Sequence, residues 1–258
     1  MKLTVLGSGS CIPAPNRGNP GYLLETDGRL ILLDGGAGAI RNIPDSGADY
    51  RQVSHICYTH LHPDHTFDFV PLQFALKNDP DLRKPHHLRI LAPKGFLEYW
   101  RRVHAIYSRW IDDDEISLEI TEHESGEESD LGFVKITTGP VVHTDHSIAF
   151  RFEDREGNVF VYSGDTGYSE EFISFASDAD LLLLESAIPE RAEFESHLTP
   201  SQAGKLASIA GARRTVLTHF YPQVEREDDI RAIVKGVYSG EVSLARDGET
   251  YQISGDRR

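Results

Sequence analysis

Three histidines and one carboxylate lie within six consecutive positions, in the segment Thr59-His60-Leu61-His62-Pro63-Asp64-His65. The segment follows a mainly apolar stretch, 53–58, that predicts a strand. Side chains two residues apart on extended backbone point the same way, so we expect His60 and His62 to reach one metal ion. Pro63 interrupts the extended run, which frees Asp64 and His65 to turn toward a second position. Imidazole nitrogen and carboxylate oxygen suit zinc, and also iron or manganese.

Three later apolar runs each deliver one metal-capable side chain at or just after their C-terminal end. In chain order these are His143 after 134–142, Asp165 after 158–162, and His219 after 214–218. In α/β sheets, sites gather at the C-terminal ends of strands. The recurrence therefore supports a metal site independently of the first motif. A polar, histidine-rich loop without ligands is the alternative interpretation of the first motif, since motif matches include false positives.

The H-x-H-x-D-H pattern at 60–65 resembles the signature of the metallo-β-lactamase superfamily. The order before it is a strand, a glycine-rich loop with Arg17, a hairpin around Asp27-Gly28, and Asp34-Gly35-Gly36. This order resembles the ribonuclease Z and phosphodiesterase branch of that superfamily. The resemblance covers nearly the whole chain and implies an α/β fold, a four-layer αββα sandwich with metals at one edge between two sheets. No linker divides the sequence, so we expect one hydrolase domain over residues 1–258.

The resemblance also implies a ligand set for two divalent metal ions, zinc first, with manganese or iron as alternatives. His60, His62 and His143 would hold one ion; Asp64, His65 and His219 would hold the other; and Asp165 would bridge them. His146 is a rival for His143, which we prefer because the strand predicted at 147–152 then begins at the family's distance. Asp34 is expected either to orient a ligand histidine or to cap a helix at 37–43.

His197 stands just outside a predicted helix, because Thr199, Pro200 and Gln202 form a capping box with proline at the first helical position. A structural loop histidine is one interpretation. However, H-L-T-x-x-Q-A at 197–203 resembles a motif specific to the ribonuclease Z and phosphodiesterase branch. There the histidine is thought to assist the leaving group, braced by a glutamate like Glu185. Classical β-lactamases lack this pair.

These features predict a dinuclear metal-dependent hydrolase. Two metals about 3.5–4 Å apart can lower the pKa of a bridging water and neutralise oxygens around phosphorus. Asp64 would orient that nucleophile as well as bind metal, and His197 would protonate the departing oxygen. A sulfatase or lactonase with the same metals is an alternative. A non-catalytic metal-binding member is the least favoured, because all seven ligand positions are filled.

The substrate class depends on the interval between His143 and Asp165. Ribonuclease Z enzymes clamp tRNA with a long arm inserted there, whereas residues 144–164 of this chain predict two strands and a turn. We therefore predict a phosphodiesterase for a small or cyclic phosphodiester, with tRNA 3′ processing as the alternative. The formal net charge of −15 also disfavours tRNA as a partner, because it removes non-specific attraction to a polyanion.

Composition is that of a globular chain, with 39% hydrophobic and 9% aromatic residues. We find no signal peptide and no apolar run near ~18 residues, so neither export nor a membrane partner is predicted. Cys11 and Cys57 are expected to be reduced, buried thiols of a cytoplasmic protein. A homodimer is one option for the oligomeric state. The aromatic edge Trp100, Tyr107 and Trp110 is assigned to packing, with one of its rings lining the substrate pocket as the alternative.

Several further elements follow from local patterns. We expect helices at 67–77, 95–110 and 230–238, a buried strand at 181–184, and solvated acidic loops at 112–115 and 122–130. The last two segments, 241–245 and 248–253, predict a terminal hairpin.

Overall fold

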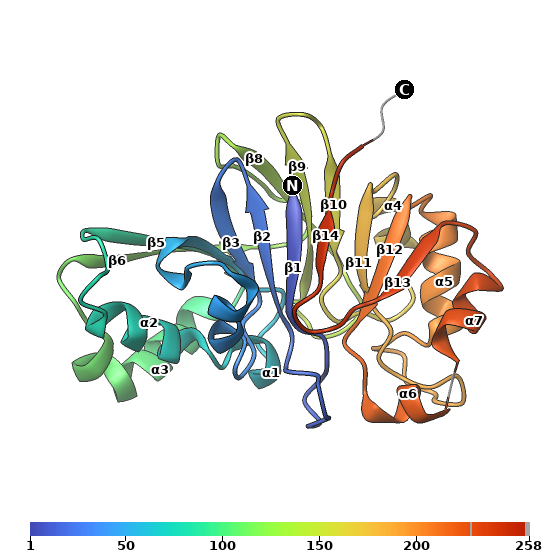
Figure 1. Ribbon diagram of the computed structural model, residues 1–258, viewed down its shortest axis with the longest axis horizontal. Helices are drawn as coiled ribbons and strands as arrows, with labels where there is room; N and C mark the ends of the chain where they lie inside the picture. The colour runs from blue at the N-terminus through green and yellow to red at the C-terminus, as the bar shows by residue number, and fades with distance from the viewer. Residues whose placement is uncertain (228, 256–258) are drawn as a thin grey trace.

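The structure, a computed structural model, describes residues 1–227 and 229–255, which form two seven-stranded sheets (Figure 1). The first sheet runs β14 (Thr250–Gln252), β1 (Lys2–Gly7), β2 (Gly21–Thr26), β3 (Arg29–Leu33), β4 (Val53–Cys57), β5 (His86–Pro93), β6 (Ile116–His123). The second runs β13 (Glu241–Leu244), β12 (Arg214–Thr218), β11 (Leu181–Glu185), β10 (Val159–Tyr162), β9 (Ile148–Asp154), β8 (Val134–Pro140), β7 (Glu128–Asp130).

Helices cover the outer side of each sheet. Along the chain they are α1 (Pro63–Thr66), α2 (Phe69–Asn78), α3 (Phe96–Ile111), α4 (Glu170–Phe175), α5 (Pro200–Ile209), α6 (Pro222–Glu227) and α7 (Ile230–Lys235). Three short 3₁₀ turns precede β4: η1 (Ile40–Asn42), η2 (Pro44–Ser46) and η3 (Tyr50–Gln52). In Figure 1, α2 and α3 lie at one end of the molecule, and α4, α5 and α7 lie at the other. The predicted αββα sandwich is confirmed.

Strand β11 illustrates why the layers form. Its alternate residues Leu181 and Leu183 belong to the hydrophobic core between the sheets, whereas Leu182 and Leu184 belong to the core between the second sheet and its helices. Successive side chains of a strand point to opposite faces, so a strand covered on both faces is an unbroken apolar run. A third core lies between the first sheet and α2 and α3.

The predicted terminal hairpin is wrong. Strand β13 pairs in parallel with β12 in the second sheet, while β14 pairs antiparallel with β1 in the first. The intervening residues cross between the sheets. The N–H of Ala245 donates to the carbonyl of Leu217 in the second sheet. In the first sheet, the N–H of Val5 donates to the carbonyl of Glu249, and the carbonyl of Val5 accepts the N–H of Gly248. Each segment completes an edge whose backbone groups would otherwise lack partners, and local sequence cannot reveal those distant edges.

Two further predictions need correction. The acidic run 122–130 contains the end of β6 and all of β7, and the Glu122 carboxylate accepts the backbone N–H groups of Gly95 and Leu97 at the start of α3. The alternating burial along β6 marks it as a strand that charge alone obscured. Cys57 is buried as expected, but Cys11 is exposed. The run 112–115 does form a loop. None of the helices within 1–227 and 229–255 is long and apolar enough to cross a membrane.

Candidate metal centre

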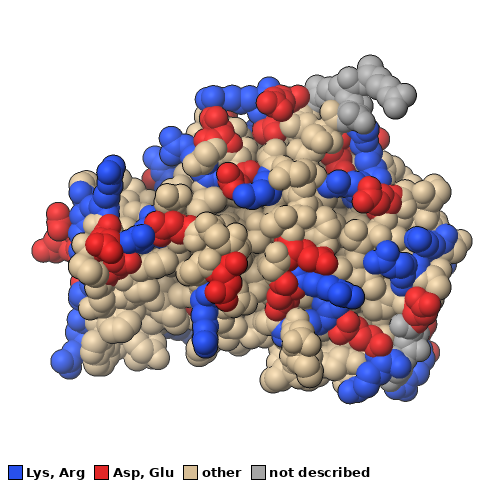
Figure 2. Space-filling view, viewed as in Figure 1, with Lys and Arg blue, Asp and Glu red and all other residues tan. Residues whose placement is uncertain are grey.

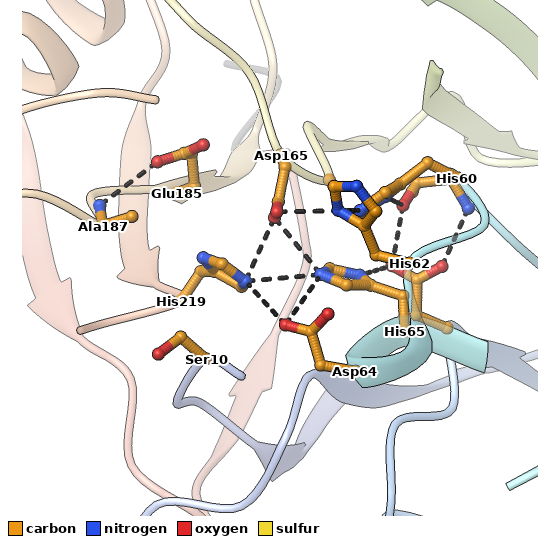
Figure 3. A network of polar contacts seen from close by, with 12 residues as sticks. Ser10, His60, His62, Asp64, His65, Asp165, Glu185, Ala187 and His219 are labelled. Atoms are coloured by element: carbon orange, nitrogen blue, oxygen red, sulfur yellow. Dashed lines mark hydrogen bonds and ion pairs between the residues drawn. The ribbon is translucent and has the colours of Figure 1, made fainter. Parts of the chain in front are cut away.

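Chain direction explains why residues from distant strands meet. Strand β9 is antiparallel to both β8 and β10, and β10, β11 and β12 pair in parallel, so β8, β10, β11 and β12 run the same way. Their C-terminal ends therefore share one edge, which receives His143, Asp165, Glu185 and His219. The segment after β4 reaches the same edge from the first sheet. The close-up in Figure 3 shows His60, His62, Asp64, His65, Asp165 and His219 gathered there.

The first cluster contains His60, His62, His143 and Asp165. Nδ1 of His62 lies 3.0 Å from Nε2 of His60 and 3.1 Å from Nε2 of His143. Oδ2 of Asp165 lies 3.7 Å from Nε2 of His60 and 3.6 Å from Nε2 of His143. Three imidazole nitrogens and one carboxylate oxygen thus converge on one position.

The second cluster contains Asp64, His65 and His219, and the other oxygen of Asp165. Pro63 begins α1 and turns the chain, which brings Asp64 and His65 away from the extended His60–His62 segment. Nε2 of His65 lies 3.3 Å from Nε2 of His219, and Oδ1 of Asp165 lies 3.3 Å from both. Oδ2 of Asp64 lies 3.6 Å from Nε2 of His219. Asp165 therefore presents one oxygen to each cluster.

The electrostatics of these groups fit divalent cations. Burial lowers the pKa of His60 well below its usual range, so its ring is neutral and retains a lone pair. Burial alone would raise the pKa of Asp165, but His219 and His65 hold it well below its usual range, so the carboxylate is ionised. Oδ1 of Asp165 is buried and accepts no hydrogen bond from the described residues. Burial alone would lower the pKa of His65, but Asp165 and Asp34 outweigh burial and raise it well above its usual range. Imidazole nitrogens around an ionised carboxylate are the donor set of zinc and related metals.

Asp34 lies beside a histidine of the second cluster and not at a helix start. Its Oδ2 is 2.8 Å from Nδ1 of His65 and accepts the hydroxyls of Thr59 and Tyr162 at 2.9 and 2.6 Å. Its Oδ1 accepts the backbone N–H of Thr59. The N–H groups around η1 are instead accepted by Asp68. A buried carboxylate held by four donors fixes both the tautomer and the orientation of the His65 ring.

We therefore expect Asp34→Asn to weaken metal binding at the second cluster by about 10–100-fold, the usual effect of losing a group that orients a ligand. Competition titration with a chromophoric chelator measures this affinity. Asp68→Asn is the matched control, because Asp68 is also a buried carboxylate but binds only backbone near η1. Equal metal affinity in Asp34→Asn and the parent protein would refute the orienting role.

Glu185, which is buried, and His197, which is partly buried, form a hydrogen-bonded pair beside the clusters. Oε1 of Glu185 lies 2.8 Å from Nδ1 of His197 and accepts the N–H of Thr166, while Oε2 accepts the N–H of Leu198. Burial lowers the pKa of His197, but the Glu185 carboxylate outweighs burial and raises it to about 9. The predicted capping box at Thr199 and Gln202 is confirmed, and it places His197 directly before α5.

His197 also lies close to the metal-ligand candidates. It forms a third grouping with Asp165 and His219 in which the donor atoms are within 4.8 Å of one another. The structure separates the two rivals named from sequence: His143 is in the first cluster, with Nδ1 3.1 Å from the carbonyl oxygen of Ser196, whereas His146 is exposed and lies in none of the three groupings.

Sequence reasoning missed two aromatic residues of the site. Tyr162 follows Phe160 at the strand period, so both face the core between the sheets, but this spacing does not reveal the contact with Asp34. Tyr221 stands edge-on to the rings of His197 and His219, with ring planes at 66° and centroids 5.9 Å from each. It lies beyond the strand that positions His219, where no periodic signal applies.

Comparisons with known proteins identify the family and the fold of the chain. A profile described as a β-lactamase superfamily domain matches residues 29–220. The ribonuclease Z of Thermobifida fusca is 28% identical over 298 aligned positions, covering 95% of this chain and 92% of that protein. The probable metallo-hydrolase YhfI of Bacillus subtilis is 28% identical over 98% of this chain and 100% of that protein.

Two solved structures extend the comparison. YhfI, described as a metallo-β-lactamase fold protein, superposes with a TM-score of 0.82 at 27% identity, over 97% of this chain and 98% of that one. A diphosphatase from the PhnP family superposes with a TM-score of 0.68 at 22% identity, over 98% of each chain, which is a likeness in fold alone.

Proposed function

Because the chain belongs to the β-lactamase superfamily and has the fold of its metal-dependent hydrolases, we propose that it is a dinuclear phosphodiesterase for a small or cyclic phosphodiester. The observation that carries the proposal is the position of His197, braced by Glu185 and within reach of the carboxylate that both clusters share. A poor alkoxide leaving group needs such an acid, whereas a readily departing group does not.

In this proposal His60, His62 and His143 hold one divalent ion, and Asp64, His65 and His219 hold the other, with Asp165 shared. We propose zinc, with manganese and iron as alternatives, because the donor set is imidazole and carboxylate. Two such ions would supply a Lewis-acidic centre that activates water and neutralises phosphoryl oxygens.

Three side chains, Asp64, His197 and Glu185, are assigned the remaining steps of the reaction. Asp64 is about one-tenth exposed, with its carboxylate oxygen near His219, and it orients the attacking water while it binds metal. His197 gives a proton to the departing alkoxide through Nε2, because Nδ1 is already bound by Glu185. Glu185 keeps the ring in that orientation and stabilises its protonated form.

The main alternative is tRNA 3′ processing, which the similarity to a ribonuclease Z favours. Three observations weigh against it. The residues between His143 and Asp165 are taken up by a short loop, β9 and β10, with no room for an arm. The alignment with the ribonuclease Z spans 298 positions, so that protein contains residues that this 258-residue chain lacks. Acidic and basic side chains are interspersed over the face in Figure 2, without the broad positive field that a polyanion needs.

A substrate panel tests the proposal. With about two metals per chain, the pure protein should hydrolyse bis-p-nitrophenyl phosphate. It should turn over precursor tRNA poorly, because the short segment between His143 and Asp165 provides no arm to bind the tRNA. p-Nitrophenyl sulfate and an acyl lactone test the other hydrolase classes. Efficient, site-specific tRNA cleavage would replace our proposal with the alternative. Preference for the sulfate or lactone would reject phosphodiester chemistry altogether.

A further inference from the structure

A cavity of about 630 Å³ opens beside His197. Most of its wall comes from the loop between β11 and α5, and the rest comes from Tyr221, Gln223 and Ile12. The lining is largely apolar and aromatic, with Ile12, Ile188, Pro189, Ala192, Phe194 and Tyr221 around it. Such a cavity at the side of a reacting centre is the usual form of a substrate pocket.

The loop that forms the wall is fixed at several points. The N–H of Ile188 donates to the carbonyl of Leu198 at 3.2 Å, which closes the base of the loop. The Glu190 carboxylate accepts both the N–H and the hydroxyl of Ser201 at the start of α5. Gly167 lies so close that a Cβ there would be 1.7 Å from the carbonyl oxygen of Glu195. The pocket is therefore formed before any ligand enters.

Two aromatic rings line this pocket, those of Phe194 and Tyr221. Phe194 is 65% exposed although it lines the cavity, so most of its ring is free to contact a ligand. Tyr221 stands edge-on to His197, with ring planes at 66°, and connects the cavity wall to the proton donor. Aromatic faces bind planar rings more strongly than saturated groups of equal size, because offset stacking and edge-to-face contacts add to burial.

We propose that this cavity binds the leaving-group portion of the substrate and selects an alcohol that carries a planar aromatic ring. The inference rests on the proposed phosphodiesterase activity, because it takes His197 as the donor to the departing oxygen. A water oxygen forms the new bond to phosphorus, the phosphorus–oxygen bond to the aromatic alcohol breaks, and the alcohol leaves with a proton. The methyl ester on the other side of a mixed diester stays on the phosphate.

The test uses two mixed diesters with leaving alcohols of similar acidity, methyl 2-phenylethyl phosphate and methyl 2-cyclohexylethyl phosphate. The metal-loaded protein should favour the phenyl compound by about tenfold in kcat/KM. The products should be 2-phenylethanol and methyl phosphate, identified by chromatography. Phe194→Ala should reduce the phenyl preference by about fivefold or more. Phe74→Ala is the matched control, because Phe74 is an exposed phenylalanine on α2 that lines a different cavity.

The outcomes separate this inference from the function on which it rests. If the protein hydrolyses neither diester and also leaves bis-p-nitrophenyl phosphate intact, the phosphodiesterase proposal fails and this inference fails with it. If it hydrolyses bis-p-nitrophenyl phosphate but neither mixed diester, this inference alone fails. If it hydrolyses both at equal rates, or if Phe194→Ala and Phe74→Ala keep the same preference, the phosphodiesterase proposal stands and the aromatic pocket is wrong. Release of methanol in place of 2-phenylethanol would place the ring on the other side of phosphorus and overturn the assignment of this cavity.

Discussion

Asp165→Ala should lower kcat/KM for a small phosphodiester by about a thousandfold or more, because metal-ion catalysis contributes several kcal/mol and this carboxylate serves both clusters. Its two oxygens lie 3.3–3.7 Å from four histidine nitrogens, two in each cluster. Its removal therefore takes a ligand from both positions at once. Steady-state kinetics with elemental analysis of the same samples measures the effect, and metal content should fall from about two per chain to below one.

Single-cluster changes provide the comparison. His143→Ala removes a ligand from the first cluster only, and His219→Ala removes one from the second only. Each should lose mainly one metal, whereas Asp165→Ala should lose both. Circular dichroism of each variant separates loss of metal from loss of fold. Retention of two metals in Asp165→Ala would show that the two clusters are independent and that Asp165 does not bridge them.

His197→Ala should show an effect that depends on the leaving group. A positioned general acid is worth about 10²–10⁴-fold when the leaving group needs a proton. An alkyl phosphodiester should therefore lose that much activity, whereas a p-nitrophenyl ester should lose far less, because p-nitrophenolate departs unprotonated. Rates on the two substrates with one enzyme preparation give the ratio directly. Metal content should not change, because we place His197 outside the ligand set.

Two further variants provide comparisons for His197→Ala. Glu185→Gln should give a milder form of the same pattern, since Glu185 acts by orienting His197. His146→Ala should change neither substrate, because His146 is an exposed neighbour of the first cluster that lies in no candidate ligand grouping. Loss of a metal in His197→Ala would instead make His197 a ligand, in line with its proximity to Asp165 and His219. Equal losses on both substrates with the metals retained would indicate that it binds the phosphoryl oxygens.

The convergence of the candidate ligands at one edge could be expected from sequence because the signals that place them are short-range. The motif at 60–65 follows one apolar run, His143, Asp165 and His219 come at or just after the ends of three others, and parallel strands bring their C-terminal ends to one edge. The position of Asp165 between the two clusters depends instead on the path of the chain beyond β10. A periodic pattern identifies the strand but not the direction in which a side chain beyond its end points.

Other features depended on contacts between residues far apart in the chain. The sequence around Asp34 allowed two roles, orienting a ligand histidine or capping a helix. Only the contact of Asp34 with His65, 31 positions later, decides between them. The alternation of β6 was hidden by its acidic residues, because charge and strand periodicity give opposite predictions there. The pocket wall at Phe194 belongs to an irregular loop, for which sequence offers no period to read.

The return of β14 to the first sheet has a consequence for protein synthesis. Strand β1 is made before the other strands of its sheet, but its outer partner comes from residues 250–252, and the N–H of Ile253 binds the carbonyl of Met1. The first sheet therefore keeps an open edge on the ribosome until residues 250–252 have emerged. The same delay applies to the candidate metal centre, because His60 is synthesised well before His219. A nascent chain of this protein thus depends on β14 to complete the sheet that β1 begins.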